Sequence, residues 1–250
     1  MKSWFISDLH LKDIKERNSQ TLLRFLLMLN QDPKNNSLYL LGDIFDFWVS
    51  DGNIFYNHYK EIVDAIVLLK KNGGQVFYFE GNHDFHVDVF WTKKFNIPVI
   101  EDVRFFQIGN YTVRLEHGDL MNPQDKKYLA YRASVRKNWV EKIGHLLPGF
   151  FLKWMGESLS AKSRKHSKNY SINNQNEIKM MIRNHAENIY QEKPFDLIIS
   201  GHMHVEDDYE FEIKDSIENK KVRSINLGTW LYRPLAVMIQ DSNIDWVFLD

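Results

Sequence analysis

The chain has 250 residues, of which 44% are hydrophobic, and it contains no cysteine. This length suits one domain with a full core, or one domain that carries an insertion. The lack of cysteine excludes disulfides, thiolate zinc sites, iron–sulfur clusters and a cysteine nucleophile. The formal net charge is −1, but residues 122–170 carry eleven Lys and Arg against three acids, which gives +8 there and −9 elsewhere. This basic block favours an anionic partner, whereas the acidic remainder disfavours binding of a long nucleic acid.

The chain shows no sign of a membrane span or a secretion signal. No apolar stretch approaches the roughly 20 residues needed to cross a bilayer. The first predicted strand begins almost at Met1, which leaves no space for a signal peptide. We therefore expect the protein to stay in the cytoplasm.

Strand-like and helix-like segments alternate along the chain, which predicts a layered α/β fold. In chain order, the patterns predict a strand at 3–7, a helix at 19–30, a strand at 37–41, a helix at 54–71, a strand at 75–80, a short helix near 86–95, strands at 103–107 and 111–116, a helical stretch at about 123–192, and strands at 195–199, 207–213, 221–227, 234–240 and 243–249.

The first part of the helical stretch interrupts the strand series and contains the basic block. We interpret about 123–170 as a helical cap inserted into a single domain that spans 1–250. Within it, Pro148-Gly149 breaks a helix, and an apolar, aromatic run follows at 150–155. Such a run fits contact with a lipid or a membrane surface, but it fits a helix pair packed on the core equally well.

Five of the predicted strands end in the same kind of polar cluster. The clusters are Asp8-Leu9-His10, Gly42-Asp43, Gly81-Asn82-His83-Asp84, His117-Gly118-Asp119 and Gly201-His202-Met203-His204. Open α/β sheets bind ligands at the carboxyl ends of their strands. One Asp-x-His pair is an ordinary loop feature, and one histidine is more often structural. Their recurrence at five strand ends predicts a metal site.

The clusters supply two carboxylates, one amide oxygen and four imidazoles, which exceeds the need of one ion. The predicted ligands are Asp8, His10, Asp43, Asn82, His117, His202 and His204. Two ions about 3.5–4 Å apart, sharing Asp43, would use all seven. Nitrogen and oxygen ligands without sulfur suit manganese, iron or zinc; we favour Mn²⁺, with Fe²⁺ and Zn²⁺ as alternatives. Such a pair binds phosphate oxygens and lowers the pKa of bound water to about 7, whereas acyl transfer is disfavoured because the chain lacks a Gly-x-Ser-x-Gly elbow.

The five clusters, extended by Asp46 after Gly42-Asp43, resemble in order the motifs of the calcineurin-like metallophosphoesterases. The resemblance implies an α/β sandwich of two mixed β-sheets flanked by helices. It also implies that one ion is held by Asp8, His10, Asp43 and His204, and the other by Asp43, Asn82, His117 and His202. In such enzymes a bridging hydroxide attacks phosphorus. His83, paired with Asp46, would stabilise the transition-state charge or protonate the leaving oxygen.

A narrower resemblance covers nearly the whole chain. It rests on Asp43-Ile44-Phe45-Asp46-Phe47-Trp48, Asn82-His83-Asp84-Phe85, His117-Gly118-Asp119 followed by Asp125, Tyr128 and Arg132, Leu147-Pro148, and Leu227-Gly228-Thr229-Trp230. These segments are similar to those of the UDP-2,3-diacylglucosamine pyrophosphatases of lipid A biosynthesis, which release UMP and 2,3-diacylglucosamine 1-phosphate. Their best-known members carry Glu and Arg at the positions of Asp46 and His83.

The narrower resemblance implies an anionic, amphiphilic nucleotide-sugar lipid as substrate, with its acyl chains in the cap. It also implies peripheral contact with the cytoplasmic face of the inner membrane, and it indicates no obligate protein partner. The predicted substrate-binding residues are Trp48, Phe85, Asp125, Tyr128 and Arg132, with Lys162, Arg164, Lys165 and Lys168 as a cluster. Trp48 and Phe85 could stack on a base or sugar, although aromatic side chains lie more often in a core. We expect Asp84 and Asp119 to orient ligand histidines.

Three alternative functions remain open. The same chemistry could act on a nucleotide, a phosphoprotein or a generic phosphodiester. The chain could be a non-catalytic scaffold, as is the retromer subunit of this superfamily, although the complete ligand set with His83 disfavours this. Cleavage of nucleic acid ranks last.

Overall fold

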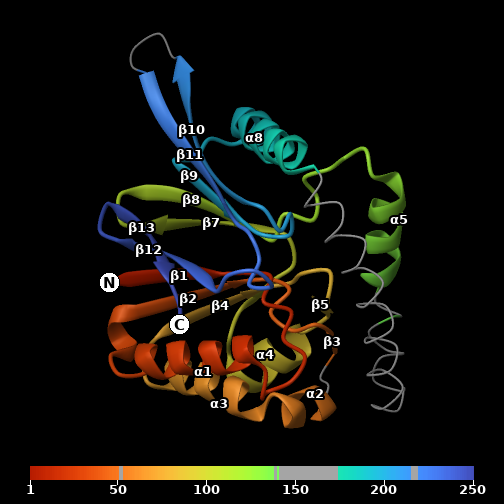
Figure 1. Cartoon of the computed structure of the whole chain (residues 1–250), viewed down its shortest axis with the longest axis vertical. Helices are drawn as coiled ribbons and strands as arrows, with labels where there is room; N and C mark the ends of the chain where they lie inside the picture. Colours follow the sequence, from red (N-terminus) through yellow and green to blue (C-terminus); the bar gives the residue numbers. More distant parts are fainter. Residues whose placement is uncertain (51–52, 138–139, 141–173, 215–218) are drawn as a thin grey trace.

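The computed structural model of the chain (Figure 1) describes residues 1–50, 53–137, 140, 174–214 and 219–250. Its helices are α1 (Arg17–Leu29), η1 (Pro33–Asn35, a 3-10 turn), α2 (Asn53–His58), α3 (Lys60–Lys71), α4 (Asp88–Phe95), α5 (Lys126–Val135) and α8 (Gln175–Glu192). Its strands are β1 (Lys2–Ile6), β2 (Asn36–Leu41), β3 (Trp48–Val49), β4 (Gln75–Phe79), β5 (Asp84–Phe85), β6 (Val99–Ile100), β7 (Val103–Ile108), β8 (Tyr111–Glu116), β9 (Leu197–Ser200), β10 (Glu206–Lys214), β11 (Asn219–Leu227), β12 (Leu235–Gln240) and β13 (Asn243–Phe248).

The strands form two large mixed sheets and one small one. The first sheet has the order β13-β12-β1-β2-β4-β6, the second has the order β10-β11-β9-β8-β7, and β3 pairs with β5. In the first sheet β1, β2, β4 and β6 run parallel, and β12 and β13 join them antiparallel. In the second sheet β8, β9 and β11 run parallel between the antiparallel strands β7 and β10. This confirms the predicted α/β sandwich of two mixed sheets.

The hydrophobic core lies in three layers because strand side chains alternate between the faces of a sheet. In β1, Phe5 faces the second sheet, whereas Trp4 and Ile6 face the helices. The layer between the sheets is completed by residues such as Leu115 and Ile199. Helices α1, α3 and α4 cover the outer face of the first sheet, and α8 covers the second (Figure 1).

The predicted elements differ from the observed ones mainly where segments are short. The helix predicted at 54–71 is two helices, α2 and α3, which meet at Tyr59. Tyr59 is buried, and its hydroxyl donates a hydrogen bond to the carbonyl of Leu11. The two-residue strands β3, β5 and β6 were not predicted, because two residues are too few to show a periodicity.

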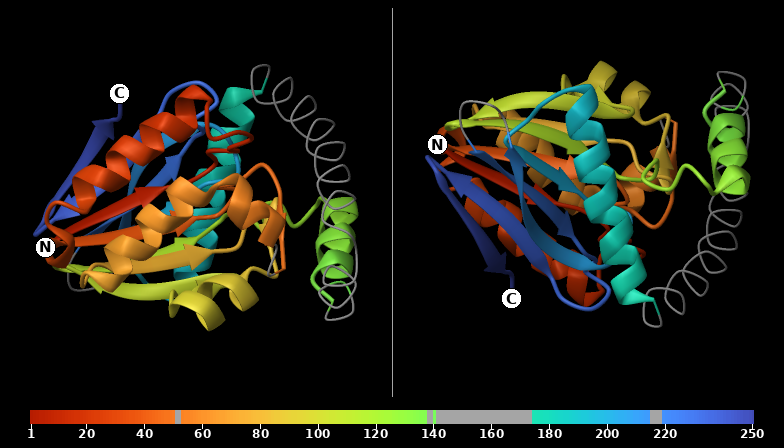
Figure 2. Two further views of the ribbon diagram at one scale, coloured as in Figure 1. Left: turned by 90° about the horizontal axis from the view of Figure 1, so that it is seen from below. Right: turned by 90° about the horizontal axis from the view of Figure 1, so that it is seen from above.

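Helix α5 is the described helix of the predicted cap, and Figure 2 shows it standing apart from the sandwich. The remainder of the basic block, including Leu147-Pro148 and residues 150–155, lies outside the described residues. The boundaries of the cap therefore stay a prediction. Within the described part of the chain, no helix is both long enough and apolar enough to cross a membrane.

Candidate metal centre

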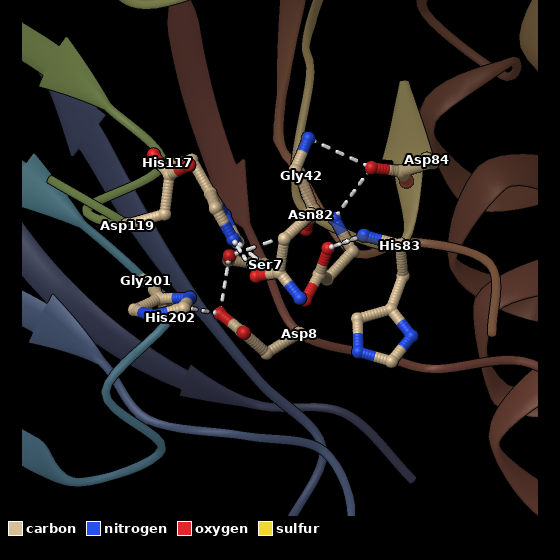
Figure 3. Close-up of polar contacts among 12 residues, drawn as sticks. Ser7, Asp8, Gly42, Asn82, His83, Asp84, His117, Asp119, Gly201 and His202 are labelled. Carbon is tan, nitrogen blue, oxygen red and sulfur yellow. Dashed lines mark hydrogen bonds and ion pairs between the residues drawn. The ribbon is translucent and has the colours of Figure 1, made fainter. Parts of the chain in front are cut away.

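The predicted ligands follow five strands whose carboxyl ends lie at one edge of the sandwich. Strands β1, β2 and β4 are neighbours in the first sheet, and β8 and β9 are neighbours in the second. The loops that follow are tied together by main-chain hydrogen bonds. The amide of Asp8 donates to Gly42 (3.1 Å), that of His10 to Asp43 (3.0 Å), and that of Gly201 to His117 (2.8 Å). The predicted ligands are thus brought together by both sheets, and Figure 3 shows four of them, Asp8, Asn82, His117 and His202, at this edge.

Five of the seven predicted ligands have a positive φ angle, which non-glycine residues rarely adopt. The angles are +55° for Asp8, +50° for His10, +53° for Asp43, +64° for His202 and +55° for His204. Such a conformation costs free energy and persists only where the surroundings hold the residue in it, and residues of this kind concentrate at functional sites. Their gathering at one sheet edge supports a functional site there.

The first group of candidate ligands consists of Asp8, His10 and His204, whose ligand atoms lie within 4.8 Å of one another. The Nε2 atoms of His10 and His204 are 3.0 Å apart. Nε2 of His204 lies 3.2 Å from Oδ1 of Asp8, and Nε2 of His10 lies 3.9 Å from the same oxygen. Asp8 and His10 are buried.

The second group consists of Asp43, His117 and His202, again within 4.8 Å of one another. Nε2 of His117 lies 3.7 Å from Oδ2 of Asp43 and 3.3 Å from Oδ1 of Asn82, so the amide predicted as a ligand adjoins this group. Oδ2 of Asp43 also lies 3.9 Å from Nε2 of His10. Asp43 therefore stands between the two groups, as a shared ligand must.

The buried charges of the two groups shift the pKa values of their members strongly. Burial raises the pKa of Asp8, but the imidazoles of His204, His117 and His10 outweigh burial and leave it well below its usual range. Burial raises the pKa of Asp43 well above its usual range, and the carboxylates of Asp84 and Asp8 add to this effect. Burial and the charge of His117 lower the pKa of His202 to about 3. Protein groups alone therefore do not neutralise both carboxylates, whereas cations would.

The donor set fits divalent metal ions. Oδ1 of Asp8 is buried and accepts no hydrogen bond from the described residues, although Nε2 of His204 is close. Two ligand atoms that are about 2.1 Å from one ion, at angles between octahedral and tetrahedral, lie about 3.0–3.4 Å apart. The distances from Nε2 of His204 to His10 and to Asp8 fall in this range. The mixed nitrogen and oxygen donors suit manganese, iron or zinc.

The predicted catalytic pair lies beside the first group. The ring nitrogens of His10 and His83 and a carboxylate oxygen of Asp46 form a third cluster within 4.8 Å, and Asp46 and His83 are buried. Nδ1 of His83 lies 2.8 Å from the main-chain carbonyl of Asp46. A carbonyl only accepts, so Nδ1 carries the proton and Nε2 presents a lone pair. The structure thus adds a main-chain contact to the predicted pairing of the two side chains.

Asp84 does something other than what we predicted. Its carboxylate accepts hydrogen bonds from the amides of Gly81, Asp43 and Ile44 at 2.8–2.9 Å and from the hydroxyl of Tyr78 at 2.6 Å. The carboxylate of Asp84 thus binds three main-chain amides and a tyrosine hydroxyl. Asp84 orients the loops that carry Asp43 and Asn82.

Sequence reasoning missed two residues that hold the loop of Asp8 and one that holds the loop of His202. Ser7 donates to Oδ2 of Asp8 (2.5 Å), and the hydroxyl of Thr229 donates to the carbonyl of Asp8 (2.9 Å). Asn226 donates to the carbonyl of Gly201 (2.7 Å). Ser7 directly precedes a predicted ligand, which was a usable signal. Asn226 and Thr229 are more than 200 residues from Asp8, and only the fold brings them near.

Trp48 was predicted to contact substrate, and the structure contradicts this. Its ring is fully buried among Phe45, Tyr59, Phe90 and Trp91, and its Nε1 donates to the carbonyl of Ser50. No ring face remains for a base or sugar, because the alternation of β3 turns this side chain into the helix-covered core. Phe85 is 5% exposed and packs against the rings of Phe47 and His86, so its predicted contact with substrate stays a prediction.

The described cap residues lie next to the second group. The hydroxyl of Tyr128 donates to Oδ2 of Asp119 (2.8 Å), and Nε of Arg132 donates to the same oxygen (2.5 Å). Burial raises the pKa of Asp119, but His117, His202 and Arg132 outweigh burial and lower it to about 2. Asp125 caps α5 by accepting from the amide of Tyr128. The lysines and arginine at 162, 164, 165 and 168 lie outside the described residues.

A pocket of about 280 Å³ opens beside His204. Its lining consists of Gln175, Lys179, His204, Val205, Glu206, Thr229 and Tyr232. The ring of Tyr232 is 53% exposed at this pocket, and Lys179 supplies a cation 3.7 Å from Asp207. The pocket adjoins the first group, whereas α5 contacts residues next to the second group.

This fold and site define a class of protein: a two-sheet α/β sandwich with two groups of carboxylates and imidazoles around a shared aspartate is a metal-dependent phosphoester hydrolase. The family model for calcineurin-like phosphoesterases matches residues 1–206. The chain therefore belongs to the calcineurin-like phosphoesterases.

Curated relatives match most of the chain at modest identity. UDP-2,3-diacylglucosamine hydrolase from Coxiella burnetii is 29% identical over 228 residues, which cover 90% of this chain and 88% of that protein. The proteins of the same name from Photorhabdus laumondii and Haemophilus influenzae are 28% and 27% identical, and each match covers 99% of this chain and 98% of the relative. Among solved structures, wild-type Vps29 from Entamoeba histolytica in complex with zinc aligns over 100% of both chains with 14% identity and a TM-score of 0.43.

Proposed function

We propose that the protein hydrolyses the pyrophosphate bond of UDP-2,3-diacylglucosamine, giving UMP and 2,3-diacylglucosamine 1-phosphate. The observation that carries the chemistry is the position of Asp43 between the two ligand groups, 3.9 Å from His10 and 3.7 Å from His117. The observation that carries the substrate is the similarity to relatives of that name over up to 99% of the chain. The substrate assignment comes from those relatives.

We assign one ion to Asp8, His10, Asp43 and His204 and the other to Asp43, Asn82, His117 and His202. Asp43 and Asn82 belong to loops held by the carboxylate of Asp84 and by the amide of His83, which donates to Oδ1 of Asp43 (2.9 Å). When bound, two divalent ions of this kind supply an activated water and neutralise charge on the phosphate. Mn²⁺ is our proposal for the ion, with Fe²⁺ or Zn²⁺ as the alternatives.

The reaction breaks one P–O bond of the pyrophosphate link and consumes one water, so the leaving phosphate oxygen must be stabilised. His83 is placed for this task because the carbonyl of Asp46 accepts from Nδ1 (2.8 Å), so that the protonated ring would present its second N–H, at Nε2, to the leaving oxygen. Its ring lies 4.9 Å from that of His10, beside the first group. The carbonyl of Asp46 thereby fixes the orientation of the ring.

A substrate with two unlike halves fits the surroundings of the metal edge. The pocket beside His204 is about 280 Å³, close to the size of small-molecule sites, and offers an aromatic ring, an amide and a cation for a nucleotide half. Helix α5 adjoins the second group through Tyr128 and Arg132, and the cap to which it belongs would receive the acylated sugar. The basic residues of the cap, Lys162, Arg164, Lys165 and Lys168 among them, would then face substrate phosphate or anionic lipid at the cytoplasmic face of the inner membrane.

The test is release of UMP from UDP-2,3-diacylglucosamine by Mn²⁺-loaded protein, with Asp43→Ala as the control. Release of UMP that is lost in the variant supports both the chemistry and the substrate. Hydrolysis of bis(4-nitrophenyl) phosphate without release of UMP would keep the chemistry and overturn the substrate. Turnover retained by Asp43→Ala would overturn the metal assignment.

A further inference from the structure

Helix α5 is attached to the sandwich in an unusual way. None of its ten residues, all within the described part of the chain, is buried. A surface helix normally docks through an apolar stripe at i, i+3 and i+4 spacing. In α5 the stripe that faces the body is polar and consists of Tyr128, Arg132 and, at the C-cap, Arg136, each four residues after the last.

Each of these side chains ends on a carboxylate next to a predicted ligand. Tyr128 and Arg132 bind Asp119, two residues after His117, and Arg132 also binds Asp102. Nη1 of Arg136 donates to Oε2 of Glu80 at 3.0 Å, and Glu80 stands two residues before Asn82. The side chains of Arg132 and Arg136 are only 13% and 12% exposed, so these are not fully solvated surface pairs.

Glu80 makes the second contact more than a simple ion pair. Its Oε1 accepts from the amide of Val87 (2.9 Å), which closes the loop that carries Asn82 and His83. Its side chain is 3% exposed. Arg136 also donates to the carbonyls of Glu101 (3.2 Å) and Gly81 (3.5 Å), and Nε2 of His86, in the same segment, lies 2.9 Å from the carbonyl of Val135. The C-terminal end of α5 thus contacts the loop of Asn82 and His83 on both sides, at Glu80 and Gly81 before these residues and at His86 after them.

We propose that Arg136 is a positioning residue for the loop of Asn82 and His83, and that α5 sets the geometry of the metal edge through Arg136 on Glu80 and Arg132 on Asp119. The proposal rests on the proposed ligand set. It assigns α5 a task beyond that of a cap: the helix holds the two segments that carry Asn82 and His117, one from each sheet, in a fixed relation. A cap that only received acyl chains would not need its inward face to end on these two carboxylates.

The test measures hydrolysis of bis(4-nitrophenyl) phosphate, a small diester without acyl chains, together with the Mn²⁺ dissociation constant. Arg136→Ala should lower kcat about ten- to hundredfold, since small displacements of reacting groups have effects of this size, while KM changes less than threefold. Mn²⁺ should bind more weakly, because Asn82 is less well held. Arg136→Lys should recover only part of kcat, since an ammonium cannot bind Glu80 and the carbonyl of Gly81 as a planar fork does.

The matched control is Arg223→Ala on β11, because Arg223 also makes a two-bond ion pair, with Asp208 at 2.8 and 2.7 Å, away from the ligands. This variant should keep kcat within twofold. Glu80→Gln should lower kcat as Arg136→Ala does, and the double variant should be no worse than either single one, because both act through one contact.

An unchanged kcat and Mn²⁺ affinity in Arg136→Ala would overturn the proposal, as would losses that multiply in the double variant. If Arg136→Ala does not fold, Arg136→Lys and Glu80→Gln decide by the same criteria. Failure of the wild-type protein to hydrolyse the lipid substrate would count against the proposed function only, because the diester and Mn²⁺ measurements do not depend on it.

Discussion

Nε2 of His10 and Nε2 of His204 lie 3.0 Å apart, although 194 residues separate them in the chain. Two imidazole nitrogens meet this closely when one donates to the other or when both face one cation. Oδ1 of Asp8 lies 3.2 Å from Nε2 of His204. Together with this oxygen, the two nitrogens fit one side of the proposed metal site.

Substitution of the shared ligand should abolish catalysis and leave the fold intact. Asp43→Asn keeps the size of the side chain and suits the positive φ of +53°, since Asn tolerates this region well. It removes the carboxylate that lies between the two groups. We expect kcat for bis(4-nitrophenyl) phosphate to fall at least a thousandfold with an unchanged circular dichroism spectrum. Activity within tenfold of the wild type would show that Asp43 is not shared.

Metal binding should stabilise the fold. The buried carboxylates of Asp8 and Asp43 lie 3.9 Å or less from imidazole nitrogens, and ions that bind only the folded state stabilise it. At 100 times the dissociation constant, Mn²⁺ should add about 2.7 kcal/mol to the free energy of unfolding. Thermal unfolding with Mn²⁺ and with a chelator measures this difference. It should be much smaller in His10→Ala, and an equal gain in that variant would contradict the assignment.

Gly81 should not tolerate a side chain. A Cβ there would overlap the carboxylate of Asp43 and approach the amide of Asp43 to 2.5 Å. Gly81→Ala should therefore displace Asp43 and lower kcat more than a hundredfold. Gly73→Ala is the control: its φ is +101° and its nearest neighbour is Lys34 at 3.1 Å, so it should cost about 1–2 kcal/mol of stability without loss of activity per folded molecule. Equal activity in both variants would be the contrary result.

Trp48 should matter for stability and not for substrate binding. The ring is fully buried, and truncation of such a side chain costs about 3–5 kcal/mol. Trp48→Ala should lower the midpoint of urea unfolding accordingly, and Trp48→Phe should lower it less. KM of the folded Trp48→Phe protein for the lipid substrate should match that of the wild type. A raised KM with an unchanged midpoint would restore Trp48 to the substrate site.

Asp196 should stabilise the protein at neutral pH, and this stabilisation should be lost in acid. Burial raises its pKa, but the ammonium of Lys220 (2.6 Å) and the amide of Thr112 (2.7 Å) outweigh burial and leave the pKa below its usual value. The resulting stabilisation is complete above the unfolded pKa of about 3.9 and is lost as pH falls through the lower folded value. Asp196→Asn should thus be less stable than wild type at pH 7, by under about 1 kcal/mol, and the difference should disappear once the pH is below the lowered pKa of Asp196. Lys220→Ala should remove most of this difference.

The order and kind of the ligand residues could be predicted because the chemistry is local. Each cluster follows a strand, and a strand shows itself by composition within five or six residues. The rule that ligands gather at carboxyl ends of strands then predicts one shared edge without knowledge of the strand order. Asp43, His117 and His202 were predicted to hold the same ion, and in the structure their ligand atoms lie within 4.8 Å of one another.

The contacts of Asp84, Trp48 and Arg136 could not be predicted in the same way, because they depend on distant segments. Asp84 accepts from amides 40 and 41 residues earlier in the chain, and Arg136 binds Glu80 across 56 residues. Whether Trp48 meets solvent or core depends on which face of β3 the helices cover. No local pattern encodes these relations.

By itself, the sequence determined which donor atoms this protein has, their order along the chain, and the strands that they follow. These features depend only on the residue itself and on residues close to it in the sequence. The tertiary structure alone decided that β1, β2 and β4 meet β8 and β9 at one edge, so that Asp43 stands between two groups of histidines. It also decided that the polar face of α5 ends on Glu80 and Asp119. Packing of the two sheets against one core sets these distances, and that packing is a property of the whole chain.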